Sequence, residues 1–272
     1  MKVLVTATVL VAAVVAAPGT VAPGTAAAQG FCRWQPEVLP LPADASNGYV
    51  SAGAGDWYMG SIEEPGSPVR HRDGAWEALP KTGGSAWAHG INASGAVVGT
   101  EFDGTDDQVV VWPALGAPAH LPRPAGVEQL SEVGPSIDDD GTVVATYHRA
   151  GTGEGYVWQP GATTPTRLAP LNAGDSVRVT DISGGVGVGW NTDGQVVRTF
   201  SGLPQAVTRP ARPRARPGRS SCRPCGERSE GWVLPEPAGY TDAGLNAVGA
   251  DTVAGGASVG DVVVPVEWRK SC

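Results

Sequence analysis

The sequence is poor in residue types that support chemistry. Among its 272 residues are only four cysteines and four histidines, and 17% of the residues are charged. It contains no Gly-x-Ser-x-Gly elbow, no His-Glu-x-x-His pair and no phosphate-binding loop. The histidines are predicted on four different strands, so nothing in the pattern brings two of them together: His71, His89, His120 and His148. We therefore predict no catalytic residue, no metal site and no cofactor.

Positive charge and helical periodicity are also lacking. The formal net charge is −8, and about −9 without Lys2, which favours solubility and argues against broad nucleic-acid binding. No long stretch has the apolar spacing of a helix, whereas 39 glycines and 24 prolines suit many short strands and turns. We therefore predict an all-β protein that is a monomer and binds no nucleic acid.

One long uncharged run lies near the N-terminus. Lys2 precedes an apolar stretch over residues 3–17, and small residues then lead to three alanines at 26–28. This order is typical of a signal peptide, with cleavage expected before Gln29. The apolar stretch is too short to span a bilayer as a helix. We expect residues 1–28 to be removed and the remainder to be secreted, without a membrane span.

A repeated unit is clearest between Ser85 and Gly126. Two strands rich in β-branched residues are predicted at 86–91 and 96–100, around a tight turn that ends in Gly95. A third strand is predicted at 108–112. A short fourth strand follows, and its prolines place it at an edge of the sheet. Four short antiparallel strands in about forty residues are the size of one β-propeller blade.

The unit recurs along the chain. The leucines predicted to open each fourth strand lie 40, 42, 47 and 66 residues apart: Leu39, Leu79, Leu121, Leu168 and Leu234. The last interval becomes similar to the others once an insertion is removed. Third strands share an aromatic position that should fill the core between blades, occupied by Trp112, Trp158, Phe200 and Trp268, with His71 in the first copy. We therefore predict a β-propeller of about five four-stranded blades over residues 29–272.

The two ends of the chain are predicted to complete one blade. Residues 36–42 match a fourth strand, and the copy that begins at Gly244 lacks one, so the N-terminal strand should pair with the C-terminal blade and close the ring. Cys32 and Cys272 then fall in the same turn, and we predict a disulfide between them. A lipoprotein anchor at Cys32 is the alternative, although bulky Phe31 occupies a position that needs a small residue.

An insertion interrupts the fourth copy. Residues 207–228 carry seven arginines and four prolines without a strand pattern, and we expect a disordered loop there. The fourth strand of this copy is predicted to follow the loop, at 232–235. The loop either lies against the acidic remainder of the protein or binds a polyanion. Cys222 and Cys225 are predicted to form a local disulfide, since redox and zinc sites need further elements that are absent here.

Three tryptophans depart from the repeat. Trp57, Trp87 and Trp190 stand where other copies carry small or aliphatic residues. Exposed aromatic rings can stack on the apolar faces of sugars, so we predict these three as ligand-binding residues; the alternative is that they fill gaps in the core. The acidic turn 138–141 resembles a calcium loop but is equivalent to the turn at 92–95 and lacks a downstream glutamate, so we predict no metal there.

One family shows a similar pattern. Residues Gly90–Gly99, followed by Val110-Val111-Trp112 and a Leu-Pro strand, resemble the bacterial extracellular HAF-type repeat, which couples such a hairpin to an aromatic strand. The resemblance extends over most of residues 31–272 and is closest in the second and third copies. The His-Ala-Phe triplet of the family is replaced by Gln108-Val109-Val110 and Gly155-Tyr156-Val157. The resemblance implies an exported propeller-like fold and no established activity, so no catalytic residue is transferred.

These patterns lead to one functional prediction and one alternative. We predict a secreted, non-catalytic binding or scaffold module whose partner is an extracellular ligand, either a glycan or a cell-surface protein. The alternative is a secreted hydrolase with carboxylates in the central channel. Asp181, on a predicted first strand, is the carboxylate to test, although a glycosidase needs a pair of them at a defined separation.

Overall fold

The computed structural model describes residues 33–62, 67–170, 174–191, 196–200, 203–206, 234–248 and 252–271. Every regular element in these ranges is a β-strand, and none is a helix. The described strands form five separate antiparallel sheets. The all-β prediction is therefore confirmed, as is the prediction of several four-stranded units.

The sheets are numbered here in chain order. Sheet 1 contains β2 (Gly48–Ala54), β3 (Trp57–Ile62), β4 (Pro68–Arg72) and β5 (Ala75–Ala78). Sheet 2 contains β6 (Ala86–Ile91), β7 (Val97–Phe102), β8 (Asp107–Trp112) and β9 (Ala119–His120). Sheet 3 contains β10 (Gln129–Leu130), β11 (Ser136–Ile137), β12 (Val143–Arg149), β13 (Thr152–Trp158) and β14 (Thr166–Arg167).

The remaining strands form two further sheets. Sheet 4 contains β15 (Val177–Ser183), β16 (Val186–Asn191), β17 (Val196–Phe200) and β18 (Leu203–Ala206). Sheet 5 contains β19 (Thr241–Val248), β20 (Thr252–Val259), β21 (Val262–Ser271) and the N-terminal strand β1 (Arg33–Val38). Sheets 1, 2 and 4 are simple meanders, in which each strand pairs with the next one along the chain.

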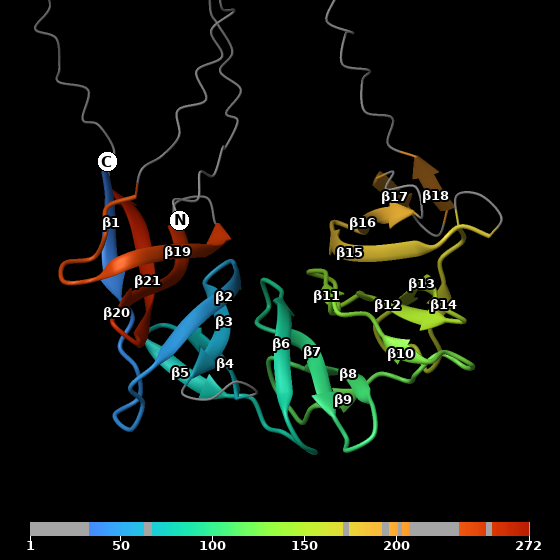
Figure 1. The fold of residues 1–272 in the computed structure, drawn as a ribbon, viewed down its shortest axis with the longest axis horizontal. Coiled ribbons are helices and arrows are strands. Elements are labelled where there is room, and N and C mark those ends of the chain that lie inside the picture. The colour runs from blue at the N-terminus through green and yellow to red at the C-terminus, as the bar shows by residue number, and fades with distance from the viewer. Residues whose placement is uncertain are drawn as a thin grey trace, which may run out of the picture.

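The sheets follow one another around an arc (Figure 1). Sheet 5 stands beside sheet 1, where β2 packs against β19, β20 and β21. Sheets 1, 2, 3 and 4 then continue the arc in sequence order. In the described part of the chain, sheets 4 and 5 stand apart and no closed ring is formed.

The N-terminal strand pairs with the C-terminal segment as predicted, but it spans residues 33–38 rather than 36–42. Strand β1 runs antiparallel to β21, from Arg33 opposite Ser271 to Val38 opposite Val266. The N-terminal strand therefore completes the sheet built by the C-terminal segment. Cys32 and Cys272 lie outside the described residues, and their disulfide stays a prediction.

Other predicted features also fall outside the described residues. They are the signal peptide at 1–28, the insertion at 207–228 and the pair Cys222 and Cys225. The predicted fourth strand of sheet 4 at 232–235 is wrong, because β18 pairs with β17 in that place. The insertion therefore follows the fourth strand of this sheet rather than preceding it.

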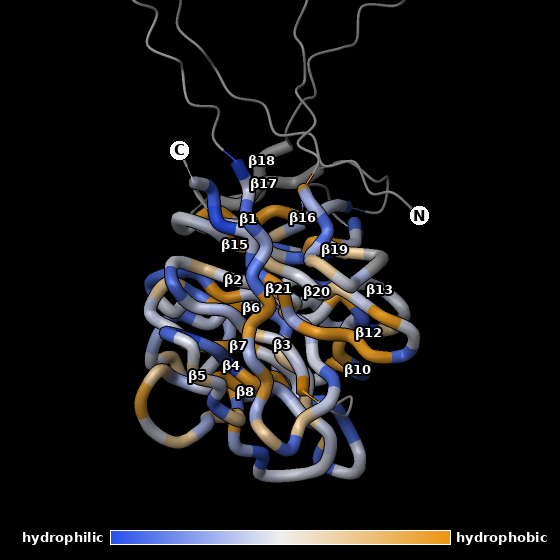
Figure 2. The backbone as a smooth tube through the Cα atoms, turned by 90° about the vertical axis from the view of Figure 1, so that its left-hand side faces the viewer, coloured by the Kyte–Doolittle hydropathy of each residue, from blue (hydrophilic) through white to orange (hydrophobic). Residues whose placement is uncertain are grey.

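Hydrophobic cores lie mainly between neighbouring sheets. Val98 and Val109 of sheet 2 pack with Tyr147 and Trp158 of sheet 3, all of them almost fully buried. The opposite face of sheet 2 packs on sheet 1 through a second cluster, which includes Trp112. Hydrophobic stretches accordingly recur in the strands, for example in β12 and β21 (Figure 2). Sheets 1, 2 and 3 each bury their two faces against two different neighbours, whereas among the described residues sheets 4 and 5, at the ends of the arc, each pack on one.

A leucine closes the ladder of most fourth strands. We predicted that it opens this strand, but in the structure it directly follows the strand, where its amide donates one more bond to the third strand. The following residue is usually proline, which has no N–H and ends the pairing. The bonds to the third strand are Leu39 to Pro265 O (2.9 Å), Leu79 to Pro68 O (3.0 Å), Leu121 to Val109 O (2.8 Å) and Leu168 to Gly155 O (2.8 Å).

The same Leu-Pro step accepts a hydrogen bond from the next sheet. The third-strand tryptophans that were predicted to fill the core are indeed buried, and each indole N–H donates to the carbonyl of such a proline. These bonds are Trp112 to Pro80 O (2.7 Å), Trp158 to Pro122 O (3.1 Å) and Trp268 to Pro235 O (2.8 Å). One side chain thus combines apolar packing with a directional bond across each of these junctions.

The first sheet uses a different arrangement. His71 occupies its aromatic position and is 4% exposed, packed between Tyr58 and Trp76 at ring-centre distances of 6.1 and 4.6 Å. The bond to the preceding Leu-Pro step is made instead by Trp76 on β5, whose indole N–H donates to Pro40 O at 2.8 Å. Neither ring nitrogen of His71 has a hydrogen-bond partner within the described residues.

The first hairpin turns also link neighbouring sheets. Asn92, in the turn of sheet 2, donates from Nδ2 to the carbonyl of Asp138 in sheet 3 at 3.0 Å. The Asp138 carboxylate accepts the amides of Gly184 and Gly185 in sheet 4, at 2.9 and 2.6 Å. Burial raises the pKa of Asp138, but its bonds from the Gly185, Asp139 and Gly184 amides outweigh this and hold the pKa below its usual value. The acidic turn therefore joins sheets 3 and 4 through backbone amides.

Changing Trp158 to Phe should destabilise the protein by about 2 kcal/mol, because the almost fully buried indole loses apolar contacts and its part-buried bond to the Pro122 carbonyl. Chemical denaturation measures this change. The matched control is Trp76→Phe, whose donor bond is exposed and should cost less than about 1 kcal/mol. Equal losses in the two variants would contradict a larger contribution from the buried Trp158 side chain and its bond.

Changing His71 to Phe should raise the free energy of unfolding by about 1 kcal/mol, because two unpaired buried nitrogens are removed. The same substitution should also reduce the loss of stability that the protein shows as the pH falls. Burial lowers the pKa of His71, although Glu267 and Asp73 oppose this. Above the unfolded-state pKa of about 6.5, His71 is neutral in both the folded and the unfolded protein. Below it, the imidazole takes up a proton more readily in the unfolded protein, so the folded protein loses stability as the pH falls. Denaturation from neutral to mildly acidic pH should show a smaller loss in the variant; an unchanged profile would contradict this.

Candidate functional site

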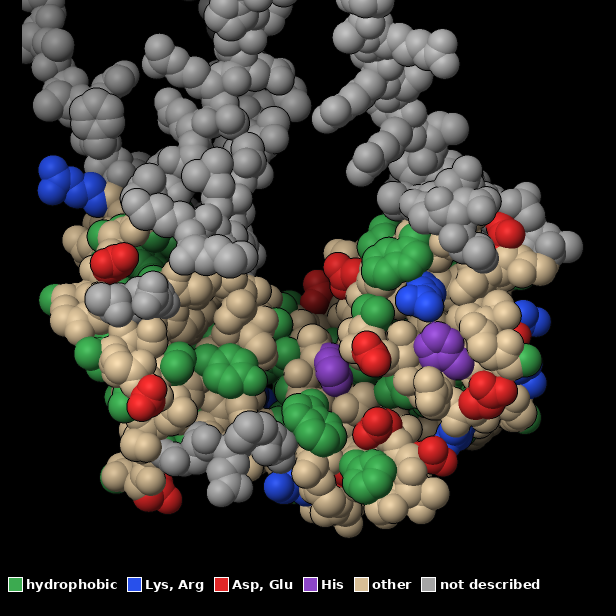
Figure 3. Space-filling model, viewed as in Figure 1, with side chains coloured by type: hydrophobic (Ala, Val, Ile, Leu, Met, Phe, Trp, Pro, Cys, Tyr) green, Lys and Arg blue, Asp and Glu red, His purple; other side chains and the backbone are tan. Residues whose placement is uncertain are grey.

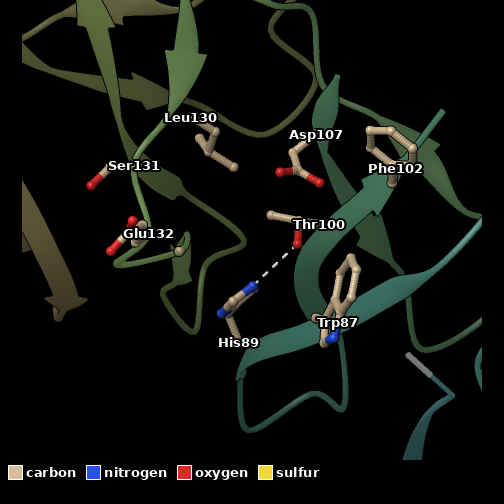
Figure 4. Close-up of a pocket in the computed structure, with 9 residues that line it drawn as sticks. Trp87, His89, Thr100, Phe102, Asp107, Leu130, Ser131 and Glu132 are labelled. Atoms are coloured by element: carbon tan, nitrogen blue, oxygen red, sulfur yellow. Dashed lines mark hydrogen bonds between the residues drawn. The ribbon is translucent and has the colours of Figure 1, made fainter. Parts of the chain in front are cut away.

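A groove of about 400 Å³ lies between sheets 2 and 3. One wall comes from β6, β7 and β8, and the other from β10 and the segment that follows it (Figure 4). The lining residues are Trp87, His89, Thr100, Phe102, Asp107, Leu130, Ser131, Glu132 and Gly134. This size is within the range of small-ligand sites in proteins.

Two aromatic side chains form one wall of the groove. Trp87 on β6 lies directly opposite Thr100 on β7, and Phe102 follows two residues later. Cross-strand partners and residues two apart share a face of a sheet, so all three side chains project toward sheet 3. Trp87 is 41% exposed and Phe102 is 39% exposed. Hydrophobic, histidine and acidic side chains accordingly gather at the surface over β6–β8 (Figure 3).

His89 forms part of the floor. The pairing of β6 with β7 shifts between Ala88 and Gly90, and this bulge releases His89 from the regular alternation. One ring nitrogen, Nε2, lies 3.2 Å from Oγ1 of Thr100. The ring is open to the groove but closely surrounded by protein atoms, so desolvation lowers its pKa, which Asp107 opposes. His89 is therefore neutral at pH 7 and offers a hydrogen-bonding group to a ligand.

Gly134 provides the space for this ring. Its φ is +77°, and a Cβ built there would lie 2.3 Å from Nδ1 of His89. Glycine adopts such a backbone conformation without strain and leaves the volume free. The loop after β10 can therefore approach β6 closely at the floor of the groove.

The polar groups of the groove are mainly acceptors. Asp107 stands at the start of β8 beside Phe102, and Glu132 projects from the opposite wall (Figure 4). Both carboxylates are exposed, and within the described residues neither has a hydrogen bond or an ion pair. Aromatic faces next to unengaged polar groups can hold a ligand that has one apolar face and several donors.

The described residues contain no group of three or more His, Cys, Asp or Glu side chains placed to hold a metal ion. They also contain no helix that could cross a bilayer. The groove is therefore described by its aromatic and polar side chains alone.

The three predicted tryptophans do not converge on one site. Only Trp87 lines the groove. Trp190 is 39% exposed on β16, where it occupies the position that Thr100 has in β7. Trp57 is half-buried at the start of β3, packed against Gly95 with the Arg72 guanidinium 4.9 Å from its ring centre.

Two further residues bear on the site: Asp181, which was predicted, and Phe102, which was not. Asp181 is exposed on β15, and its carboxylate accepts bonds from the Ser136 hydroxyl and the Ile182 amide, both at 2.8 Å. Phe102 was missed in the sequence. Its signal is an aromatic residue at the end of a second strand, on the same face as Trp87, but only the neighbouring sheet makes that face a groove.

Scans against protein-family models and curated proteins gave no match. Among solved structures, human WBSCR16 is similar at 12% identity and a TM-score of 0.42, covering 57% of this chain and 51% of its own. An acylaminoacyl peptidase of Pyrococcus horikoshii has 13% identity and a TM-score of 0.42, covering 57% and 26%. A putative TolB from Agrobacterium tumefaciens has 12% identity and a TM-score of 0.43, covering 79% and 71%. The chain thus matches about half of the first protein and a quarter of the second, and such distant similarity transfers neither activity nor partner.

Changing Gly134 to Ala should destabilise the protein by about 1–3 kcal/mol through backbone strain, and should push the His89 ring outward. The pKa of His89 should then rise toward its ordinary value, which a histidine NMR titration measures. Gly151→Ala is the matched control, since its φ is +74° but a Cβ there meets nothing within 4 Å. An unchanged pKa of His89 in Gly134→Ala would contradict the packing described here.

Proposed function

We propose that this chain is an exported five-bladed β-propeller, related to HAF-type repeat proteins, that binds an extracellular carbohydrate in the groove between sheets 2 and 3. The single observation that supports this most strongly is the pair of exposed aromatic rings on one wall. Trp87 and Phe102 stand side by side with polar groups opposite. Sugars combine apolar faces with hydroxyl groups, so such a wall and its polar partners suit a sugar ring.

The remaining parts of the proposal come from sequence patterns and from the sheets. The N-terminal segment has the order of a signal peptide, which supports secretion. Four-stranded meanders that bury their faces against neighbours support the propeller assignment. The Asp181 carboxylate accepts bonds from the Ser136 hydroxyl and the Ile182 amide, which favours a structural role for this side chain, and we propose binding without catalysis.

Changing Trp87 or Phe102 to Ala should weaken binding to a responsive polysaccharide by about ten-fold, since a lost stacking contact costs about 1 kcal/mol or more. The measurement is a binding screen of the protein against cell-wall fractions and a polysaccharide panel. Tyr49→Ala is the matched control, because Tyr49 is 45% exposed but lies outside the groove.

A variant that lacks residues 207–228 separates the groove from the arginine-rich insertion. Binding that persists without the insertion and falls with Trp87→Ala supports the proposal. Binding that disappears with the insertion indicates electrostatic capture. No binding to any polysaccharide, or equal losses in Trp87→Ala and Tyr49→Ala, would overturn the carbohydrate proposal.

A further inference from the structure

The two acidic side chains of the groove differ from the buried acidic side chains elsewhere. Glu101 accepts the Gly83 amide at 2.7 Å and pairs with His120 at 2.7 Å. Glu154 lies 2.7 Å from Arg167 and 3.0 Å from Arg149. In each case the protein itself supplies donors that neutralise a carboxylate at a junction between strands.

Glu267 follows the same pattern in sheet 5. It accepts the Tyr58 hydroxyl at 2.7 Å and pairs with Arg269 at 2.9 Å. By contrast, Asp107 and Glu132 have no such partner among the described residues. Their charges are therefore available to a ligand in the groove.

The groove also lacks positive charge of its own. None of its lining residues is lysine or arginine. His89 adds no charge near neutral pH, because desolvation lowers its pKa. Two carboxylates on opposite walls, beside two aromatic rings, thus form a negatively charged site of about 400 Å³.

We propose that the groove selects a sugar that carries a free ammonium group, such as a glucosamine unit of a deacetylated polysaccharide. This inference rests on the proposed carbohydrate-binding function and narrows its ligand class. The apolar face of the sugar ring stacks on Trp87 and Phe102. The ammonium group pairs with Asp107 or Glu132, and the aromatic faces also attract a nearby cation.

The charge of the ligand discriminates between related sugars. Acetylation of the amine keeps the ring and its hydroxyls but removes the positive charge, so the N-acetylated sugar loses the ion pair. A neutral glucose unit loses it as well. A basic peptide would satisfy the carboxylates but lacks the flat, hydroxyl-bearing ring, and it serves below as a competing outcome.

The test compares three oligosaccharides of equal length by calorimetry: glucosamine, N-acetylglucosamine and glucose oligomers. The protein is used as the full chain, at a mildly acidic pH that keeps the amines protonated. The glucosamine oligomer should bind about three- to ten-fold more tightly than the other two, and the advantage should shrink at high salt.

Variants assign this advantage to the groove. Asp107→Asn and Glu132→Gln should each lower glucosamine affinity about three- to ten-fold and lower affinity for the acetylated oligomer by less, so that the preference for glucosamine shrinks. Asp44→Asn and Glu236→Gln are matched controls, since both side chains are exposed and lie outside the groove. They remove the same charge and should have no effect.

Each outcome decides between the two proposals. Equal affinity for the glucosamine and acetylated oligomers overturns the selection of the ammonium group but leaves carbohydrate binding intact. Binding of poly-lysine as tight as that of glucosamine, unaffected by Trp87→Ala, overturns it in favour of a basic peptide. No binding to any of the three sugars, and none to the wider panel, overturns both proposals.

Discussion

A four-stranded sheet of this size has two apolar faces and cannot cover either by itself. The rest of the structure depends on this constraint. Sheet 2 buries Val98 and Val109 against sheet 3 and Trp112 against sheet 1. The hydrophobic core is therefore divided into layers, and each layer is stabilised by the contact between two neighbouring sheets. Geometry must be fixed at every junction, since packing alone is not directional.

Hydrogen bonds that recur with the repeat fix the orientation of each sheet relative to the next. A buried indole N–H from one sheet meets the carbonyl of a Leu-Pro step, as between Trp158 and Pro122. At the hairpin turns, Asn92 reaches sheet 3 and Asp138 reaches sheet 4. The residues that make the repeat visible in the sequence are thus largely those that join one sheet to the next. The regular spacing of these residues along the chain therefore has a structural cause.

The groove arises where the repeat is broken. A bulge in β6 turns His89 into the space between sheets 2 and 3, and Gly134 leaves room for its ring. Trp87 and Phe102 then stay exposed beside carboxylates that the protein does not neutralise. Exposed aromatic rings and unpaired charges contribute little to folding here, so they are the features that binding would explain.

Sequence reasoning alone predicted the strands, the period and the pairing of the chain ends, because alternation, turn glycines and spacing are local properties. It also identified the buried tryptophans, and Trp87 as a departure from the repeat. It placed the leucines at the start of the fourth strands, whereas they directly follow these strands. It also assigned residues 232–235 to sheet 4, because spacing does not tell which neighbour a segment pairs with. Only the tertiary structure brought Phe102, Asp107 and Glu132 around Trp87, since these side chains come from two sheets whose juxtaposition depends on packing rather than on sequence order.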